Sequence, residues 1–264
     1  MSDGDVTSII RERLKCIEDQ QRVRILYAVE SGSRAWGFPS PDSDYDVRFI
    51  YCRPRDHYLS IDLDRKPDVI EYPVDDDLDM SGWDVRKALQ LFEKSNPALV
   101  EWLSSPIRYE ERGAFAAKAR RLLPDIYRPA SGVHHYRRMA MEHHRRWLHR
   151  PLVPIKKYFY VLRPLLCAIW IERHQTPPPV PFAQLLPLVR DNPDLLRAID
   201  GLLEQKASTR EMGLAPPIHT IDCFVDENVS FTAKSISDTP VPIEAREKPN
   251  RLFRWVVDAP WPGA

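Results

Sequence analysis

The sequence predicts an α+β protein in which a small α/β domain precedes an all-helical domain. Three observations lead to this prediction. Short β-rich runs alternate with helical windows in the first part of the chain, strand signals fade beyond Pro106, and the segments that follow have helical spacing broken by prolines. We expect the α/β domain over residues 1–112, the helical domain over 113–234 and a proline-rich C-terminal segment over 235–264.

The α/β domain begins with an amphipathic helix. Ile10, Leu14 and Ile17 recur at helical spacing after Thr7 and Ser8, which are suitable N-cap residues. Short β-rich runs bounded by polar turns then predict strands or extended segments at residues 24–29, 45–51, 69–72 and 78–80.

Helical spacing dominates the rest of the chain. A helix is expected from Asp84, and its apolar stripe is interrupted by a tight turn at Asn96-Pro97. Further apolar stripes predict helices over 134–149, 155–171, 182–189 and 195–206. The polar, proline-broken stretch 235–249 predicts a loop or a partly ordered tail.

Composition excludes several classes of protein. The 38 basic and 38 acidic residues balance, which excludes a globally basic nucleic-acid coat but allows a local basic face. A hydrophobic share of 43% is too high for a disordered chain. The N-terminal residues lack the basic start and apolar run of a signal peptide, and the window 161–171 contains Arg163 and is too short to span a bilayer.

The cysteines are far apart and form no CxxC pair, which excludes zinc ribbons and zinc fingers. Their spacing also argues against a disulfide framework, so we expect a protein of the reducing cytoplasm. The four positions are Cys16, Cys52, Cys167 and Cys223.

The informative stretch runs from Gly32 to Arg48, GSRAWGFPSPDSDYDVR. Asp44 and Asp46 stand one residue apart at the start of a strand, so their side chains point the same way, with Cα atoms about 6.5–7 Å apart. Paired carboxylates are costly unless a cation sits between them, and Mg²⁺ takes carboxylate and phosphate oxygens. Upstream, Gly32-Ser33 follows a strand and offers backbone N–H groups and a hydroxyl to a phosphate. This combination is what phosphoryl or nucleotidyl transfer requires.

The acidic stretch also has simpler interpretations. Asp42-Ser43-Asp44 also suits a simple turn with local side-chain hydrogen bonds. A calcium loop that starts at Asp42 fails at Val47, where glycine is needed, and at Arg53, where glutamate is needed. The chain has no Walker A motif and no GxGxxG, so P-loop and Rossmann sites have no support.

The order GS, spacer, DSDYD at the head of an apolar strand resembles the polymerase-beta-type nucleotidyltransferase superfamily. Longer strings resemble more narrowly the RNA-ligase-associated predicted nucleotidyltransferases, the YcgL-like family. These strings are GSRAWGFPSPDSDYDVRFIY, Leu78-Asp79-Met80 before GWDVRKALQLFEKSNPALVEWLSSP, and KKYFYVLRPLLCAIWI. The resemblance extends from the N-terminal region to about residue 225, and its diagnostic part lies within residues 30–106.

The resemblance implies a polymerase-beta-like catalytic domain and specific residue roles. Gly32 and Ser33 match the phosphate-contacting pair, and Asp44 and Asp46 match the ligands of Mg²⁺, or of Mn²⁺ in its place. A third acid is expected on a neighbouring strand, where it would bind metal and act on the attacking hydroxyl. Asp79 is preferred, and Glu71 is the alternative.

The resemblance also places a nucleotide-binding face on the helical domain. Lys156, Tyr160 and Arg163 recur at i, i+4 and i+7, hence on one helix face, where they would hold the triphosphate of an NTP. Lys157 lies beside this face and could substitute. The competing interpretation is a surface helix with solvated basic residues. The family's association with RNA ligases implies an RNA acceptor in RNA repair and a functional link to a ligase.

The run HHYRRMAMEHHRRWLHR, residues 134–150, is rich in arginine and histidine but contains no HExxH zinc motif. Arg138 and His143 fit a loose Arg-x4-His pattern, which is expected by chance in such a run. Arginines interleaved with Tyr136 and Trp147 suit RNA backbone and stacking contacts. A solvated helix is the alternative.

These inferences predict a metal-dependent nucleotidyltransferase that moves NMP from an NTP to a hydroxyl, most simply of RNA, and releases pyrophosphate. Three rival functions remain at this level: nucleotidylation of a protein or small molecule, a metal-dependent phosphoesterase, and a non-catalytic RNA-binding module.

Overall fold

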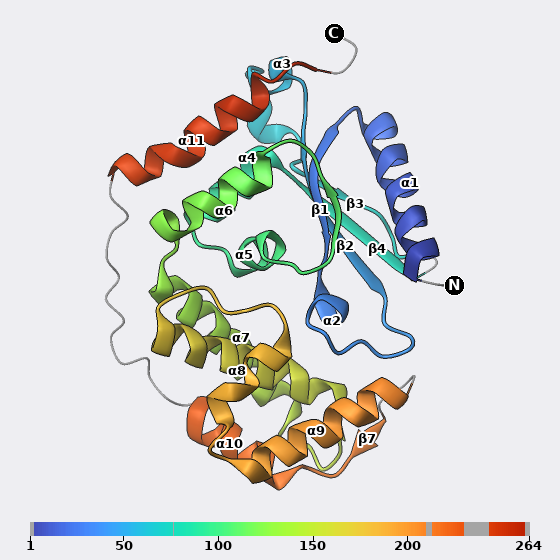
Figure 1. Ribbon diagram of the computed structural model, residues 1–264, viewed down its shortest axis with the longest axis vertical. Coiled ribbons are helices and arrows are strands. Elements are labelled where there is room, and N and C mark those ends of the chain that lie inside the picture. The colour runs from blue at the N-terminus through green and yellow to red at the C-terminus, as the bar shows by residue number, and fades with distance from the viewer. Residues whose placement is uncertain (1–2, 76, 210–212, 230–242, 262–264) are drawn as a thin grey trace. The chain divides into compact units, whose positions relative to one another are not determined.

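The computed structural model describes residues 3–75, 77–209, 213–229 and 243–261 (Figure 1). The chain divides into two compact units. The sheet unit comprises residues 1–32, 44–127 and 240–264, and the helical unit comprises residues 33–43 and 128–239.

The sheet unit contains a five-stranded sheet and the helices that cover it. Its elements are α1 (Asp3–Gln21), β1 (Arg24–Glu30), β2 (Tyr45–Cys52), α3 (Arg55–Tyr58), the 3-10 turn η1 (Leu63–Arg65), β3 (Val69–Glu71), β4 (Leu78–Asp84), α4 (Val85–Glu93), α5 (Pro97–Leu103), β5 (Arg108–Glu111), α6 (Phe115–Ile126) and α11 (Ile243–Val257). A short helix, α2 (Gly32–Ala35), begins at the unit's boundary.

The strands lie in the order β3-β4-β2-β1-β5. Only the β2–β4 pair is parallel among the described pairs of this sheet; the others are antiparallel. Alternating residues of the strands face two separate cores. On one face Phe49 of β2 belongs to a cluster with Ile10 and Leu14 of α1. On the other, Ile50 belongs to a cluster with Leu89 of α4 and with residues of α5, α6 and α11.

Local sequence accounts for the two helices that follow β4. Asp84 is the N-cap of α4, where its side chain accepts a hydrogen bond from the Arg86 backbone N–H. Asn96 caps α5 through the Leu99 backbone N–H, and Pro97 takes the first helical position, where a missing N–H costs nothing. The structure therefore shows the interruption expected at Asn96-Pro97.

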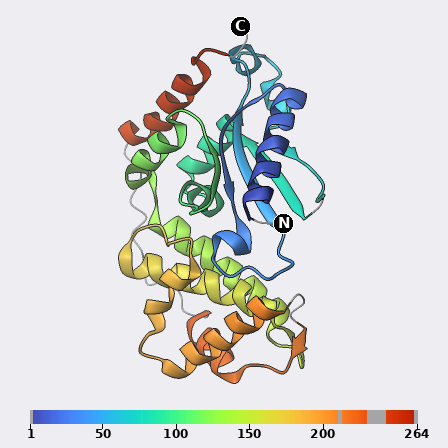
Figure 2. The same ribbon diagram turned by 45° about the vertical axis from the view of Figure 1, so that its right-hand side comes forward.

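The helical unit is organised around α8. Its elements are α7 (Pro129–Trp147), β6 (Val153–Pro154), α8 (Lys156–His174), the 3-10 turns η2 (Phe182–Gln184) and η3 (Leu186–Val189), α9 (Pro193–Ser208), β7 (Leu214–Ala215) and α10 (His219–Val229). Residues 161–169 of α8 are all buried, so this helix lies at the centre of the core. Helices α7 and α8 lie side by side (Figures 1 and 2).

Helices of the second half form near the expected places, with three differences. The expected helix over 182–189 is two 3-10 turns, because Pro187 interrupts it. The small antiparallel pair β6–β7 adds to the helical unit, and β5 adds an edge strand to the main sheet. None of the described helices is long and apolar enough to cross a membrane.

The unit boundaries differ from the expected ones at residues 112–113 and 234–235. Helix α6 belongs to the sheet unit because Phe115 and Ile126 are buried in the cluster that contains Ile50 of β2. Conversely, residues 33–43 belong to the helical unit, where the Phe38 ring stacks on Phe159 with centroids 4.7 Å apart. Tertiary packing of apolar side chains, which no local pattern reports, decides both assignments.

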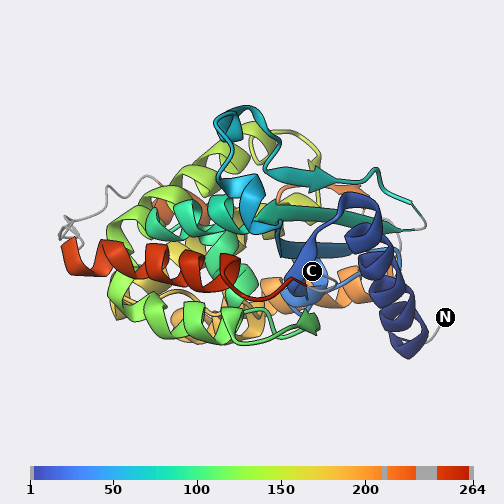
Figure 3. The same cartoon turned by 90° about the horizontal axis from the view of Figure 1, so that it is seen from above.

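The C-terminal segment is not simply a loop. Residues 235–242 of the expected loop lie outside the described residues, but residues 243–249 form the first part of α11. This helix packs on α4 and α6, as seen from above in Figure 3, with Leu252 and Val256 buried. Burial of these apolar side chains stabilises the helix although Pro249 lies inside it.

Candidate active site

The two aspartates of the acidic motif lie at the start of β2. Asp44 immediately precedes the strand and is exposed, whereas Asp46 is its second residue and is half-buried. Strand alternation places Asp46 and Arg48 on the sheet face opposite α1, because Val47 and Phe49 between and beside them belong to the α1 cluster.

Parallel pairing of β2 with β4 sets Asp46 directly beside Asp79. One guanidinium nitrogen, Arg48 Nη2, donates to both carboxylates, at 3.0 Å from Asp46 Oδ1 and 2.7 Å from Asp79 Oδ2. Arg48 Nη1 also donates to the Asp79 carbonyl at 2.8 Å. Asp46, Asp79 and Arg48 thus form one cluster, which we call the acid pair and its arginine.

Glu71, the alternative third acid, lies elsewhere. It is exposed at the end of β3, where its backbone pairs with Ser81 of β4. The β-sheet register therefore brings Asp79, and not Glu71, to Asp46.

A buried glutamate fixes the backbone of Asp46. Glu30, at the end of β1, is 1% exposed, and its Oε1 accepts from the Asp46 backbone N–H at 2.8 Å. Its other carboxylate oxygen accepts a hydrogen bond from the Tyr109 hydroxyl. The next residue, Ser31, donates its backbone N–H to the Asp46 carbonyl at 2.8 Å. Both backbone groups of Asp46 are therefore held from the end of β1.

Gly32 brings the turn after β1 against the same aspartate. Its φ is +60°, in the left-handed region that favours glycine. A Cβ at this position would lie 1.9 Å from Asp46 Oδ2, so any side chain would displace the carboxylate. The main chain of the Gly-Ser motif thus lies against Asp46 of the acid pair. Only glycine at position 32 leaves room for this close approach.

The rest of the Gly-Ser loop belongs to the helical unit. Ser33 Oγ donates to Ser43 Oγ at 3.1 Å, and Arg34 donates to the Ser43 carbonyl at 2.8 Å. The Trp36 carbonyl accepts from the Phe182 backbone N–H at 2.9 Å. These contacts give the loop a defined shape within its own unit.

Charge at the acid pair is unfavourable for carboxylates alone. Burial raises the pKa of Asp46, while Arg48 lowers it and the neighbouring charges of Asp79 and Asp44 raise it again. The net direction is upward. A cation of higher charge than one guanidinium would stabilise the ionised pair further.

The donor set fits Mg²⁺ in part. Mg²⁺ is commonly held by one or two carboxylates, with water and substrate phosphate completing its coordination, and Asp46 and Asp79 supply such a pair. No three histidine, cysteine, aspartate or glutamate side chains of the described residues converge closely enough to hold a metal ion. Asp44 would therefore have to turn toward the pair to act as a third ligand.

The expected nucleotide-binding face on α8 is divided by burial. Lys156 and Tyr160 are exposed, as that role requires. Arg163 is only 3% exposed, lies over the Trp36 ring at 4.4 Å and donates to the Val180 carbonyl at 3.2 Å. The helix face that Lys156, Tyr160 and Arg163 share is exposed at its start and buried at Arg163. Arg163 is therefore a packing residue of the helical unit.

The arginine- and histidine-rich run forms most of α7. Tyr136 is buried, and Arg137 pairs with Glu172, so neither faces a nucleic acid. Arg138 is exposed but pairs with Glu142, one helical turn away. His143 lies against the Tyr160 ring, with centroids 5.4 Å apart. The exposed, charge-rich part of the run is thus its C-terminal end.

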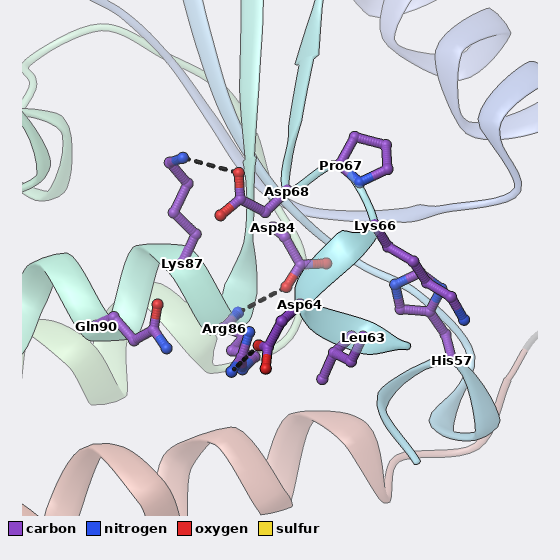
Figure 4. Close-up of a pocket in the computed structure, with 10 residues that line it drawn as sticks. All are labelled: His57, Leu63, Asp64, Lys66, Pro67, Asp68, Asp84, Arg86, Lys87 and Gln90. Carbon is purple, nitrogen blue, oxygen red and sulfur yellow. Dashed lines mark hydrogen bonds and ion pairs between the residues drawn. The ribbon is translucent and has the colours of Figure 1, made fainter. Parts of the chain in front are cut away.

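A cavity of about 240 Å³ lies at the far end of β4 from Asp79 (Figure 4). Its lysines and arginine are already paired: Arg86 with Asp64 at 3.0 Å, Lys87 with Asp68 at 2.8 Å and Lys66 with Asp62 at 3.2 Å. Asp84 at its edge is occupied as the N-cap of α4. The cavity has no surplus charge of either sign and is not the acid site.

Two residues of the site were missed by the sequence analysis. Arg48 follows Asp46 by two residues in the same strand, and strand alternation places such residues on one face of the sheet. This spacing could have identified Arg48 from the sequence. Glu30 ends the buried run RILYAVE directly before Ser31-Gly32, and a carboxylate in such a place indicates a specific partner. Which partner it finds depends on strand pairing.

Comparison with known proteins gives two findings. The profile of the family described as RNA repair pathway DNA polymerase beta family matches residues 6–255. The protein described as uncharacterized protein YcgL from Bacillus subtilis (strain 168) is 44% identical over 257 residues, which cover 96% of each chain.

Proposed function

The chain belongs to the RNA repair pathway DNA polymerase beta family, and from this membership we propose that it is a metal-dependent nucleotidyltransferase that transfers NMP from an NTP to a hydroxyl of RNA. The observation that supports the proposal most directly is the register of β2 and β4, which sets Asp46 beside Asp79 with Gly32 against them. Carboxylates that share one cation beside a phosphate-accessible turn suit this chemistry.

In the proposed reaction the acceptor oxygen attacks the α-phosphorus of the NTP. A new P–O bond forms, the bond to the bridging oxygen breaks, and pyrophosphate leaves. Asp79 accepts the proton of the attacking hydroxyl, and Asp46 keeps its orientation through Glu30 and Ser31. Mg²⁺, or Mn²⁺, would be held by Asp46 and Asp79, with Asp44 once it turns toward them, and would supply charge stabilisation for the phosphate oxygens.

The triphosphate is assigned to backbone and basic groups. Gly32 and Ser33 offer main-chain N–H groups, and Lys156 and Tyr160 offer a cation and a hydroxyl from α8. Arg163 has no part in the assignment because it is buried.

RNA is proposed as the acceptor from the family's description and from the basic end of α7. Addition of a nucleotide to an RNA end prepares a substrate for a strand-joining reaction, so we also propose a functional link to an RNA ligase. The cysteines support a reducing, cytoplasmic setting, since the exposed Cys16 and Cys223 and the buried Cys52 are thiols rather than disulfides.

The test is transfer of label from each of the four α-labelled NTPs, with Mg²⁺ or Mn²⁺, into total RNA and total protein. Wild type is compared with the Asp44→Ala, Asp46→Ala double variant. Label in RNA that the variant does not add supports the proposal and identifies the nucleotide. Label in protein would show that the acceptor is a protein and not RNA. Hydrolysis of the NTP without transfer would indicate a phosphoesterase. RNA binding without hydrolysis or transfer would indicate a binding module.

A further inference from the structure

The end of α7 and the start of α8 gather cations around two aromatic rings. Three of them surround Trp147, with charged atoms 4.6–5.0 Å from the ring centroid: Arg146, Arg150 and Lys157. Lys157 Nζ also lies 4.5 Å from the centroid of the Tyr160 ring. Attraction between cations and ring faces offsets part of the repulsion among these charges. We call the surface formed by Arg146, Arg150 and Lys157 the cation face.

The cation face has no counter-charge of its own among the residues that the structure describes, where none of Arg146, Arg150 and Lys157 forms an ion pair. Arg137 and Arg138, on the same helix α7, pair with Glu172 and Glu142. Partial burial lowers the pKa of Lys157, and the positive charges of Lys156 and Arg146 lower it further.

We propose that the cation face binds the sugar–phosphate backbone of single-stranded RNA. Three cations that form no ion pair within the described residues suit several phosphates of a polyanion, because each can contact a phosphate oxygen of its own. Aromatic rings among the cations are typical of single-strand binding surfaces. The inference rests on the proposed function in taking the polyanion to be the RNA acceptor.

The test measures binding of a fluorescein-labelled, mixed-sequence oligoribonucleotide of about 12 nucleotides by anisotropy at several salt concentrations. The Arg146→Gln, Lys157→Gln double variant is compared with Arg138→Gln, which removes a paired cation from the same helix. We expect the double variant to bind at least about tenfold more weakly. The slope of log affinity against log salt concentration should fall in magnitude by about 1.4, as expected for two lost phosphate contacts.

Equal losses in the Arg138→Gln control, or an unchanged salt slope in the double variant, would overturn the assignment of the face. Stronger binding of an RNA duplex of equal length would overturn the single-strand assignment. Label-transfer assays keep the two proposals apart. Wild type that binds RNA through the face but transfers no label retains this inference and refutes the proposed function. If wild type transfers label to RNA but the double variant binds RNA as tightly as wild type, the proposed function is retained and this inference is refuted.

A second inference stands on the independent geometry of Arg48. Its side chain is 19% exposed, and one nitrogen donates to both members of the acid pair. Two half-buried carboxylates in parallel register repel one another, and a shared donor keeps an oxygen of each pointing at the same place. A divalent ion held by Asp46 and Asp79 would need these same oxygens.

We infer that Arg48 is a positioning residue that serves as the resident counter-cation of the acid pair and gives up those contacts when a divalent ion binds. The first part requires only the fold, and the second rests on the proposed metal dependence. Removing the positive charge should therefore cost stability most when no divalent ion is present.

The test compares melting temperatures of wild type, Arg48→Gln and Arg48→Lys in EDTA and in a Mn²⁺ titration. We expect Arg48→Gln to melt about 2–4 °C lower in EDTA and to regain this difference at saturating Mn²⁺, with Arg48→Lys in between. Adding Asp79→Asn to Arg48→Gln should raise the melting temperature in EDTA, because the repulsion disappears.

An Arg48→Gln protein with wild-type melting in EDTA, or one that Asp79→Asn fails to rescue, would refute the counter-cation role. If Mn²⁺ changes neither protein while the rescue succeeds, the counter-cation role stands and the proposed metal dependence fails.

Discussion

The acid pair in the sheet unit and the cation face in the helical unit are both clusters of like charge, but they are balanced differently. Asp46 and Asp79 share a guanidinium from their own sheet. Among the described residues, the cations around Trp147 have aromatic faces and the Arg146 carbonyl beside them, but no carboxylate partner. A guanidinium cancels charge, whereas a ring only reduces repulsion.

This difference indicates what each cluster does. The guanidinium of Arg48 beside the acid pair can be exchanged for another cation, which suits a catalytic site. The cation face carries a surplus of positive charge, which suits binding of an external polyanion. Substitution in the two regions should therefore affect different measurements, chemistry in one and salt-dependent binding in the other.

The largest expected effect comes from removing the charge of Asp79. Asp79→Asn should lower the rate of label transfer by about 10²–10⁴-fold, because the acceptor of the hydroxyl proton is lost. RNA affinity at the cation face should be unchanged. Glu71→Gln is the matched control, since Glu71 lies exposed on the next strand, and its rate should stay near wild type. A large loss in Glu71→Gln with little in Asp79→Asn would reverse the assignment of the third acid.

Two glycines with positive φ, Gly32 in the sheet unit and Gly37 in the helical unit, allow the stabilities of matched variants to be compared. Gly32→Ala should destabilise by more than Gly37→Ala, because both pay about 1–2 kcal/mol of backbone strain but only the Gly32 variant pushes against Asp46. A Cβ at Gly37 meets nothing within 4 Å. Denaturant unfolding gives the free energies, and equal losses in the two variants would contradict the close approach at Gly32.

The smallest expected effect concerns Asp84, at the opposite end of β4 from Asp79. Burial raises the pKa of Asp84, although the Arg86 N–H and the Tyr58 hydroxyl lower it. The folded chain therefore binds this proton more readily than the unfolded chain, and the stability from Asp84 is lost as the pH rises above 3.8.

Asp84→Asn keeps an N-cap residue for α4 but removes the titration. The free energy of unfolding of wild type, relative to this variant, should thus fall with rising pH in urea titrations. A difference that is independent of pH would contradict the raised pKa, and lost label transfer in a folded variant would contradict the separation of Asp84 from the reaction.

Local sequence patterns predicted much of the fold. The spacing of Ile10, Leu14 and Ile17 predicted α1, and Asn96-Pro97 predicted the break between α4 and α5. Arg163 shows the limit of such patterns, because helical spacing groups it with Lys156 and Tyr160 but does not report that its end of the face enters a core. Residues 243–249 show the opposite case: a loop or partly ordered tail was predicted there, but they form the first part of α11, which the burial of Leu252 and Val256 stabilises.

The sequence by itself determined the α+β class, the order of the strands along the chain and the Asp44–Asp46 spacing, because these depend on periodicity and short-range sterics. Only the tertiary structure decided that Asp79 stands beside Asp46, that Glu30 holds the Asp46 backbone and that Arg48 joins the two carboxylates. These relations depend on strand pairing between distant segments. Pairing is set by the packing of whole sheet faces, which no short window of sequence contains.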